Sequence, residues 1–201
     1  MKDFLKKCNP VDVIIISYCI VTGIIIILAH NKLQNSAIHL LIRFLILFVS
    51  LSFISLSELD HKIIRFIRHF YPLLFLGFFY SETDYYNNLL FDNFDPLLVH
   101  IEQIVFGLQP ALEFSNLLNF RWFSELMHFG YFSYYLIVFA VPLIFYLKEQ
   151  TEFKRVLFIT VFSFCIYYLI FILFPSVGPQ FYFSTQESAV PKGFVFYEIM
   201  Q

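Results

Sequence analysis

The sequence has 201 residues, of which 59% are hydrophobic, 21% aromatic and only 14% charged, and its mean hydropathy is +0.73. A soluble domain carries about a quarter charged residues, so this composition excludes an ordinary soluble protein and indicates a polytopic membrane domain. The formal net charge of −2 provides no general basic surface, which excludes nucleic acid as a partner.

The first predicted span is the apolar run at residues 13–29, which follows three lysines. A signal peptide is one interpretation, but the run is long and no A-x-A cleavage pattern follows it, which favours a retained span. The three cysteines, Cys8, Cys19 and Cys165, are not clustered. We expect small buried hydrophobic side chains at Cys19 and Cys165, with neither a disulfide framework nor a metal site.

Two more spans are predicted at residues 38–57 and 63–80. Arg43 lies near the outer end of the second span, where a long basic side chain can extend to the membrane interface. In the third span, Pro72 either kinks the helix or delays its start.

Residues 81–125 differ in kind, because no uncharged run of about 18 residues occurs there. The pattern predicts short amphipathic helices lying in the interface plane. Asp95-Pro96 is typical of a helix start, with Asp95 as the cap. Apolar residues then recur at helical spacing: Leu97, Leu98, Ile101, Ile104, Val105 and Leu108.

The fourth span is predicted at residues 126–147, with a kink at Pro142, and a tight charged loop follows at 148–155. The fifth span, at residues 156–174, has 19 uncharged residues, or about 28 Å of helix, enough to cross a bilayer core of about 30 Å. The predicted fold is therefore all-α: a polytopic bundle of about five transmembrane helices, with interfacial helices between the third and fourth.

Orientation follows from the basic residues. If the N-terminus is cytoplasmic, the cytoplasmic segments hold nine of the 13 lysines and arginines: Lys2, Lys6, Lys7, Lys62, Arg65, Arg68, Lys148, Lys154 and Arg155. The positive-inside rule favours this orientation. It predicts an integral membrane protein whose residues 81–125 and 175–180 both face the extracytoplasmic side.

The fifth span ends in Pro175-Ser176-Val177-Gly178-Pro179-Gln180. Two prolines and a glycine break the helix and are expected to leave backbone amides exposed. Irregular backbone at that depth is tolerated where protein or a water-filled cavity covers it. The sequence therefore predicts that this turn forms the wall of a site on the outer face.

Familiar catalytic motifs are absent from the sequence, including G-x-x-x-x-G-K-[ST], G-x-S-x-G, H-E-x-x-H and C-x-x-C. However, residues 85–183 contain, in order, FDPLLVHIEQIVFGLQPALEF, FGYFSYYLIVFAVPLIFYL and YYLIFILFPSVGPQFYF. This order resembles the type 2 phosphatidic acid phosphatase superfamily, in its inositol-phosphorylceramide-synthase-like branch. The resemblance implies a helical membrane core with an outward-facing site, a lipid substrate, and no metal or other cofactor.

In that family, a histidine downstream of the Gly-Pro turn attacks the phosphorus, and a second histidine oriented by an aspartate serves as acid and base. Such phosphoryl transfer depends mostly on positioning and charge stabilisation. The resemblance implies that Gly178, Pro179 and Gln180 form the phosphate-side turn. Tyr134 and Tyr135 are candidates to line the site from the fourth span. The alternatives are an ordinary helix-stop turn and ordinary aromatic packing.

The sequence departs from the family pattern in two ways. Gln180 stands where relatives often have a basic residue, and an amide donates hydrogen bonds without bringing charge. The F-P-S-x-H and H-x-x-x-D motifs are absent, because no histidine follows Gln180, so no catalytic residue is assigned. We interpret residues 1–80 as N-terminal transmembrane helices and 81–201 as an incomplete phosphatase-like core with an outer loop at 175–201. A truncated chain is favoured over a degenerate family member.

The predicted function is an integral-membrane lipid phosphatase or phosphotransferase that acts on lipid phosphates or phospholipid headgroups at the extracytoplasmic face. Whether this chain is an enzyme by itself stays open, and we expect it to be inactive alone. The alternative is a non-catalytic membrane protein, such as a transporter half or an assembly subunit. Spans 1, 4 and 5 contain almost no ionisable residues, which disfavours a transporter. An acyltransferase would need a paired His and Asp. No oligomeric state is predicted.

Overall fold

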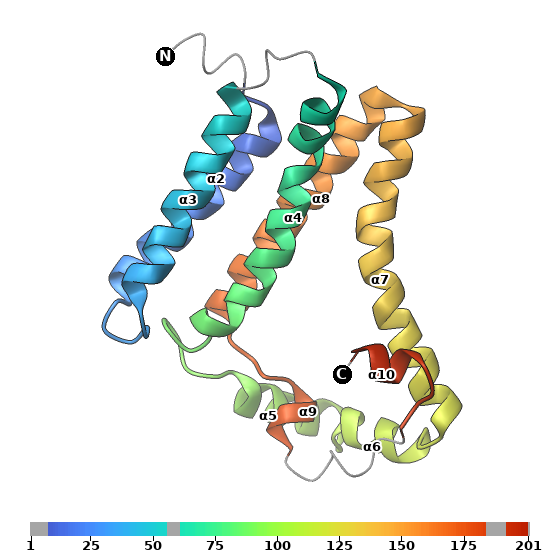
Figure 1. Ribbon diagram of the computed structural model, residues 1–201. Helices are drawn as coiled ribbons and strands as arrows, with labels where there is room; N and C mark the ends of the chain where they lie inside the picture. Colours follow the sequence, from blue (N-terminus) through green and yellow to red (C-terminus); the bar gives the residue numbers. More distant parts are fainter. Residues whose placement is uncertain (1–7, 56–60, 184–191, 201) are drawn as a thin grey trace. The chain divides into compact units, whose positions relative to one another are not determined.

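The computed structural model describes residues 8–55, 61–183 and 192–200. Within these ranges every regular element is a helix (Figure 1). Five helices are long and apolar enough to cross a membrane: α2 (Pro10–Leu28), α3 (Ser36–Ser55), α4 (Lys62–Tyr86), α7 (Arg121–Lys148) and α8 (Gln150–Leu173). The predicted all-α polytopic fold with five spans is confirmed.

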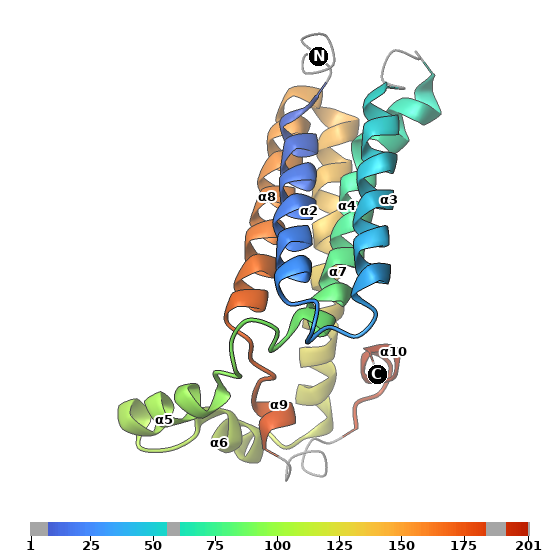
Figure 2. The same ribbon diagram turned by 90° about the vertical axis from the view of Figure 1, so that its left-hand side faces the viewer.

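The described residues form two compact units. The first contains the chain up to Phe91 together with Phe145–Leu173, and so holds α2, α3, α4 and α8. These helices lie side by side in both views (Figures 1 and 2), with α2 packed against α3 and α8, and α4 against α8. At the centre, the Tyr18 ring on α2 lies 4.5 Å from Phe79 on α4 and 6.4 Å from Tyr168 on α8. Aromatic side chains therefore join three spans in one core.

The outward face of α3 is apolar. Leu41, Phe44 and Phe48 are 56%, 64% and 61% exposed, and their spacing of three and four residues places them on one side of the helix. A contiguous apolar face of this kind marks a surface that contacts a membrane or another protein. By contrast Cys19 and Cys165 are buried, as the sequence predicts.

The second unit contains Asp92–Ile144 and the chain from Phe174 onward. It holds most of α7 and four short helices: α5 (Asp95–Phe106), α6 (Pro110–Leu117), α9 (Pro179–Tyr182) and α10 (Phe196–Met200). Gly107, with φ of 69°, ends α5 in the left-handed conformation that glycine adopts most readily, and Pro110 begins α6.

The short helices predicted between the third and fourth spans are thus present as α5 and α6. The predicted apolar stripe is exposed at every position: Leu97, Leu98, Ile101, Ile104 and Val105 on α5, and Leu108 just after the helix ends. An exposed stripe of this kind is what a helix lying in the membrane interface presents to lipid.

Several predicted boundaries are wrong. Pro72 does not delay the third span, because α4 begins at Lys62 and continues through the proline to Tyr86. The boundary predicted between residues 80 and 81 therefore falls inside a helix, and residues 81–86 extend the span. α7 begins at Arg121 rather than at residue 126.

The charged loop predicted at residues 148–155 is also wrong, because α8 already begins at Gln150. Glu152, Lys154 and Arg155 are good helix formers, so their charge does not end the helix. Phe153, in the first turn of α8, is only 1% exposed. Its side chain packs this turn against the core.

Candidate functional site

A buried carboxylate holds the proline-glycine turn of the second unit. Asp95, at the start of α5, is 4% exposed. Its Oδ1 accepts hydrogen bonds from the Ser176 hydroxyl at 2.8 Å and the Gly178 amide at 3.0 Å, and its Oδ2 accepts one from the Val177 amide at 2.8 Å. The start of the amphipathic segment and the end of the last span therefore meet, although more than 80 residues separate them in the sequence.

Two further contacts next to Asp95, a backbone hydrogen bond and a contact between rings, hold these two segments together. The Phe94 amide donates to the Pro175 carbonyl at 2.9 Å, and the Phe94 ring lies 5.6 Å from that of Phe174. The turn thus has one defined conformation. Gly178, with φ of 77° and ψ of 165°, takes a backbone conformation that only glycine adopts without strain.

Two sequence expectations are corrected here. Asp95 was expected to cap its own helix, but Phe94 occupies the N-cap position and the Asp95 side chain binds the turn instead. The amides of the turn were expected to be exposed, but those of Val177 and Gly178 are already bonded to the carboxylate. A phosphate could bind these two amides only by displacing Asp95.

The same contacts alter the acidity of Asp95. Burial alone raises the pKa of a carboxyl group, because it disfavours the charged form. Hydrogen bonds from Val177, Ser176 and Gly178, together with Asn93, outweigh that burial and hold the pKa of Asp95 below its ordinary value. Asp95 is therefore an anion at neutral pH, which suits a positioning residue rather than a proton donor.

The structure brings together some of the predicted site residues. Gly178 lies on the Asp95 carboxylate, and Pro179 follows as the first residue of α9. The Gln180 side chain lies outside the described part of the structure. Tyr134 and Tyr135 are both about half exposed on α7, with ring centroids 5.7 Å apart. The Tyr135 hydroxyl donates to that of Tyr131 at 3.1 Å, one turn earlier on the same helix.

A second carboxylate of the same unit was missed by the sequence reasoning. Glu125, on α7, accepts hydrogen bonds from the backbone amides at the start of α10, with distances of 2.7 to 3.4 Å: Phe194, Val195, Phe196 and Tyr197. Arg121, one turn earlier, donates to the carbonyl oxygens of Lys192 and Gly193. One turn of α7 thus anchors the described C-terminal segment through its backbone.

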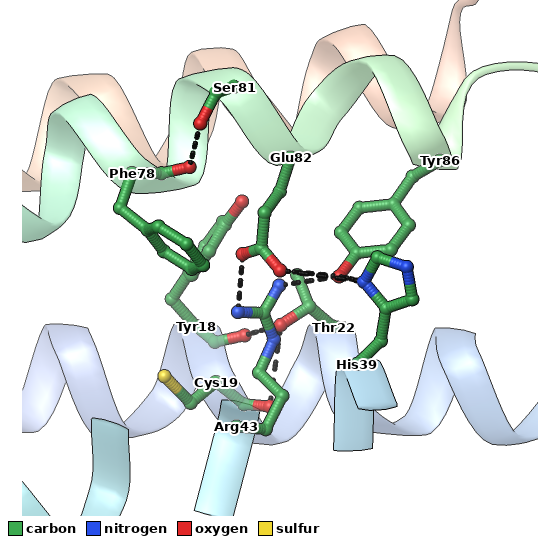
Figure 3. Close-up of polar contacts among 9 residues, drawn as sticks. All are labelled: Tyr18, Cys19, Thr22, His39, Arg43, Phe78, Ser81, Glu82 and Tyr86. Atoms are coloured by element: carbon green, nitrogen blue, oxygen red, sulfur yellow. Dashed lines mark hydrogen bonds and ion pairs between the residues drawn. The ribbon is translucent and has the colours of Figure 1, made fainter. Parts of the chain in front are cut away.

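The first unit contains a buried charge cluster that was also missed (Figure 3). Arg43 on α3 donates to Glu82 on α4 at 2.6 Å and to the Tyr86 hydroxyl at 2.9 Å, and that hydroxyl donates to Glu82 at 3.0 Å. His39 Nδ1 lies 3.3 Å from the same hydroxyl. Arg43 and Glu82 are each 3% exposed. The expectation that Arg43 extends to the interface is therefore wrong, since its charge is neutralised inside the bundle.

A second buried pair lies between α2 and α4. Arg68 donates to Asp12 through both terminal nitrogens, with 2.6 Å for the Nη1 bond. The Tyr71 hydroxyl donates to the same carboxylate at 2.5 Å, and the Asn9 amide does so at 2.8 Å. Asp12 is fully buried. Four donors on one carboxylate stabilise its charge where water is excluded.

A pattern in the sequence could have identified the first of these pairs. Arg43 lies seven residues after the start of α3, and Glu82 lies four residues before the end of α4. Neighbouring antiparallel spans place these positions at similar depth, about 6–10 Å from the helix ends. An unpaired charge is costly at such a depth, so opposite charges there predict a contact.

Comparisons complete the description of these sites. The chain was compared with models of known protein families, with curated proteins and with solved structures, and no match was found. The resemblance to the phosphatidic acid phosphatase superfamily therefore stays a prediction from the residues quoted for it. The geometry around Asp95 and the buried ion pairs are the observations from which a function can be argued.

Proposed function

We propose that this chain forms the lipid-recognition part of an integral-membrane lipid phosphatase or phosphotransferase. Its site would be the turn at Ser176–Gly178 with Pro179 and Gln180, facing the extracytoplasmic side. The observation that carries the proposal is the Asp95 contact, in which a buried carboxylate ties the amphipathic segment to the helix break that ends the last span.

The contact defines a role for each part of the site. Asp95 is a positioning residue, because its oxygens are used by the turn and do not reach a ligand. A bound phosphate would meet the residues that follow, Pro179 and Gln180, whose amide side chain offers hydrogen bonds without charge. Phosphoryl transfer itself needs a nucleophile. The family resemblance assigns that role to a histidine downstream of the turn, and all six histidines of this sequence precede it.

Photo-crosslinking in nanodiscs tests this proposal. The protein is exposed to photoactivatable phosphatidic acid or to the matching diacylglycerol, which lacks the phosphate. We expect phosphatidic acid to label residues 174–183 several-fold more than diacylglycerol, and Asp95→Ala to remove that preference. Asp92→Ala is the matched control, because it removes an exposed carboxylate three residues away. Equal labelling by both lipids would rule out phosphate recognition at the turn.

A non-catalytic function is the second candidate, and the buried ion pairs favour it. Intramembrane ionisable residues often mark ion or substrate paths, and here they join α3 to α4 and α2 to α4. The argument against transport relied on spans 1, 4 and 5, whereas these charges lie mainly on the second and third spans. Transport would require ion or solute flux in sealed vesicles, and its loss in Glu82→Gln would support that function over the lipid enzyme.

A further inference from the structure

The first unit contains a pocket at the opposite end of α4 from Glu82. It has a volume of about 160 Å³ and is lined by the first turns of α2, the early part of α4 and the early part of α8. That space is larger than a single water molecule needs and much smaller than an entire lipid, so it suits a group the size of a phosphoryl group.

The lining combines polar and apolar residues. Asp12, Arg68, His69 and Lys154 are among its charged or polar residues, and Leu157 and Phe158 are among its apolar ones. A pocket with both kinds of wall suits a ligand with a charged group and an apolar body.

The charge balance of the pocket favours a single anion. Asp12 neutralises Arg68 through the ion pair between α2 and α4, but the Nε of Arg68 is buried without a hydrogen-bond partner among the described residues. Lys154 is exposed and no ion pair of its ammonium group is found in the described ranges. The positive charge of Lys154 is therefore unmatched among the described residues, while that of Arg68 is already neutralised.

The histidine adds a further donor or acceptor. His69 Nδ1 lies 2.6 Å from the Arg65 carbonyl, and this contact assigns the proton of the neutral ring to Nδ1. Its Nε2 is then an acceptor in the neutral ring and a donor in the protonated ring.

The depth of the pocket indicates where the anion comes from. Arg68 lies six residues into α4 and Lys154 four residues into α8, which is within about 9 Å of the helix ends. At that depth an unpaired charge is costly, so we expect the exposed Lys154 side chain to extend outward to the headgroup layer, where the phosphates of phospholipids lie. Basic residues at span ends on the cytoplasmic side attract anionic lipids, and the positive-inside rule predicts that this end is cytoplasmic.

We propose that this pocket binds the phosphate group of an anionic phospholipid, held by Lys154 beside the Asp12–Arg68 pair, with Leu157 and Phe158 against the start of its acyl chains. The site lies in a different unit from the Asp95 turn and does not depend on the proposed lipid chemistry there. It would fix the depth of α2, α4 and α8 by tying them to the headgroup layer.

Native mass spectrometry of the detergent-purified protein tests the site by titrating phosphatidylglycerol against phosphatidylcholine. We expect tighter binding of phosphatidylglycerol, and a loss of about five-fold in Lys154→Gln, the effect of one lysine near an anionic surface. Arg155→Gln is the matched control: it removes the same charge from the adjacent exposed position, where Arg155 lies 3.8 Å from Glu152. We expect less than half of that effect there.

Two results would overturn the proposal: equal affinity for the two lipids, or equal loss in both variants, which would reflect general surface charge. Competition with millimolar glycerol phosphate identifies the source of the phosphate group. We expect the lipid to be retained, because the proposed ligand is a phospholipid. Its displacement would show that the pocket takes a soluble phosphate ester and would overturn the assignment to a lipid.

Discussion

Arg43 and Glu82 lie deep in an apolar bundle where each side chain neutralises the other. Their 2.6 Å contact and near-complete burial leave no water to replace a lost partner. Breaking such a pair from one side strands a charge, whereas replacing both partners by apolar side chains is often neutral or stabilising. The pair therefore restricts how α3 and α4 pack against each other, even though its net contribution to the free energy of unfolding is small.

A double-mutant cycle tests this reasoning. We expect Arg43→Met alone to lower the free energy of unfolding by about 3–5 kcal/mol, because Glu82 is left buried and unpaired. The double variant Arg43→Met/Glu82→Leu should recover most of that loss. Thermal unfolding in detergent measures both. Additive losses in the double variant would mean that the two charges are not coupled.

Asp95 supports a prediction about pH. Its folded pKa lies below the ordinary value of 3.8, so its contribution to holding the turn is complete above about pH 5 and is lost as pH falls through the lowered pKa. We expect the amides of Val177 and Gly178 to stay protected from hydrogen exchange at neutral pH and to lose protection in acid, after correction for intrinsic exchange.

The asparagine variant separates this effect from general acid unfolding. Asp95→Asn loses one acceptor oxygen and the charge, so we expect about ten-fold faster exchange at Val177 and Gly178 at neutral pH, with little further change in acid. Asp92→Asn should behave like the natural protein. The same acid response in Asp95→Asn would show that Asp95 does not control the turn.

At the scale of elements, carboxylates as well as ring contacts fix two backbone segments of the second unit. The turn at Ser176–Gly178 and the start of α10 both present adjacent amides to one carboxylate, Asp95 or Glu125. Backbone amides that point to one place form an anion site. In this unit the anions are side chains of the protein itself.

Gly193 tests the second of these contacts. A Cβ atom there would overlap Glu125 Oε2 and lie 2.6 Å from the Tyr197 Cβ, so Gly193→Ala must push the segment away from α7. We expect several-fold faster hydrogen exchange at residues 194–197. Gly130→Ala is the matched control on α7, because an added methyl group meets nothing within 4 Å. Unchanged exchange in Gly193→Ala would contradict the contact.

For the whole molecule, topology is the property that links the spans to any function. The distribution of lysine and arginine predicts a cytoplasmic N-terminus, which places α6 outside the cytoplasm and the start of α8 inside. Five apolar helices of sufficient length agree with the number of crossings used in that argument.

Single-cysteine labelling measures this topology. In a background with Cys8, Cys19 and Cys165 replaced by alanine, we expect a membrane-impermeant maleimide to label Asn116→Cys in intact cells. Thr151→Cys should react only after permeabilisation. Both positions are exposed, so burial does not limit either reaction. The reverse pattern would invert the topology and move the Asp95 turn to the cytoplasmic side.

The sequence predicts most of the fold because membrane spans depend on local composition. Runs of about 20 apolar residues must form helices in a bilayer, where every backbone group needs an internal partner. Helix ends are less predictable, since charged residues such as Lys154 and Glu82 continue a helix when their neighbours are buried. The boundary errors at α4 and α8 have this cause.

The candidate site was predictable only in part. The break at Gly178 is visible in the sequence because glycine and proline have specific backbone preferences. The residue that binds this break cannot be identified from the sequence, because Asp95 lies more than 80 residues away. Local preferences predict that Asp95 caps its own helix, and the contact with the distant turn overrides them.

Local composition thus accounts for the membrane class, the five helices and the irregular turn. Which carboxylate binds the turn, and which charges pair inside the bundle, depends on contacts between residues far apart in the chain. Desolvation makes these contacts decisive, because a buried charge or amide must find a partner wherever packing places one.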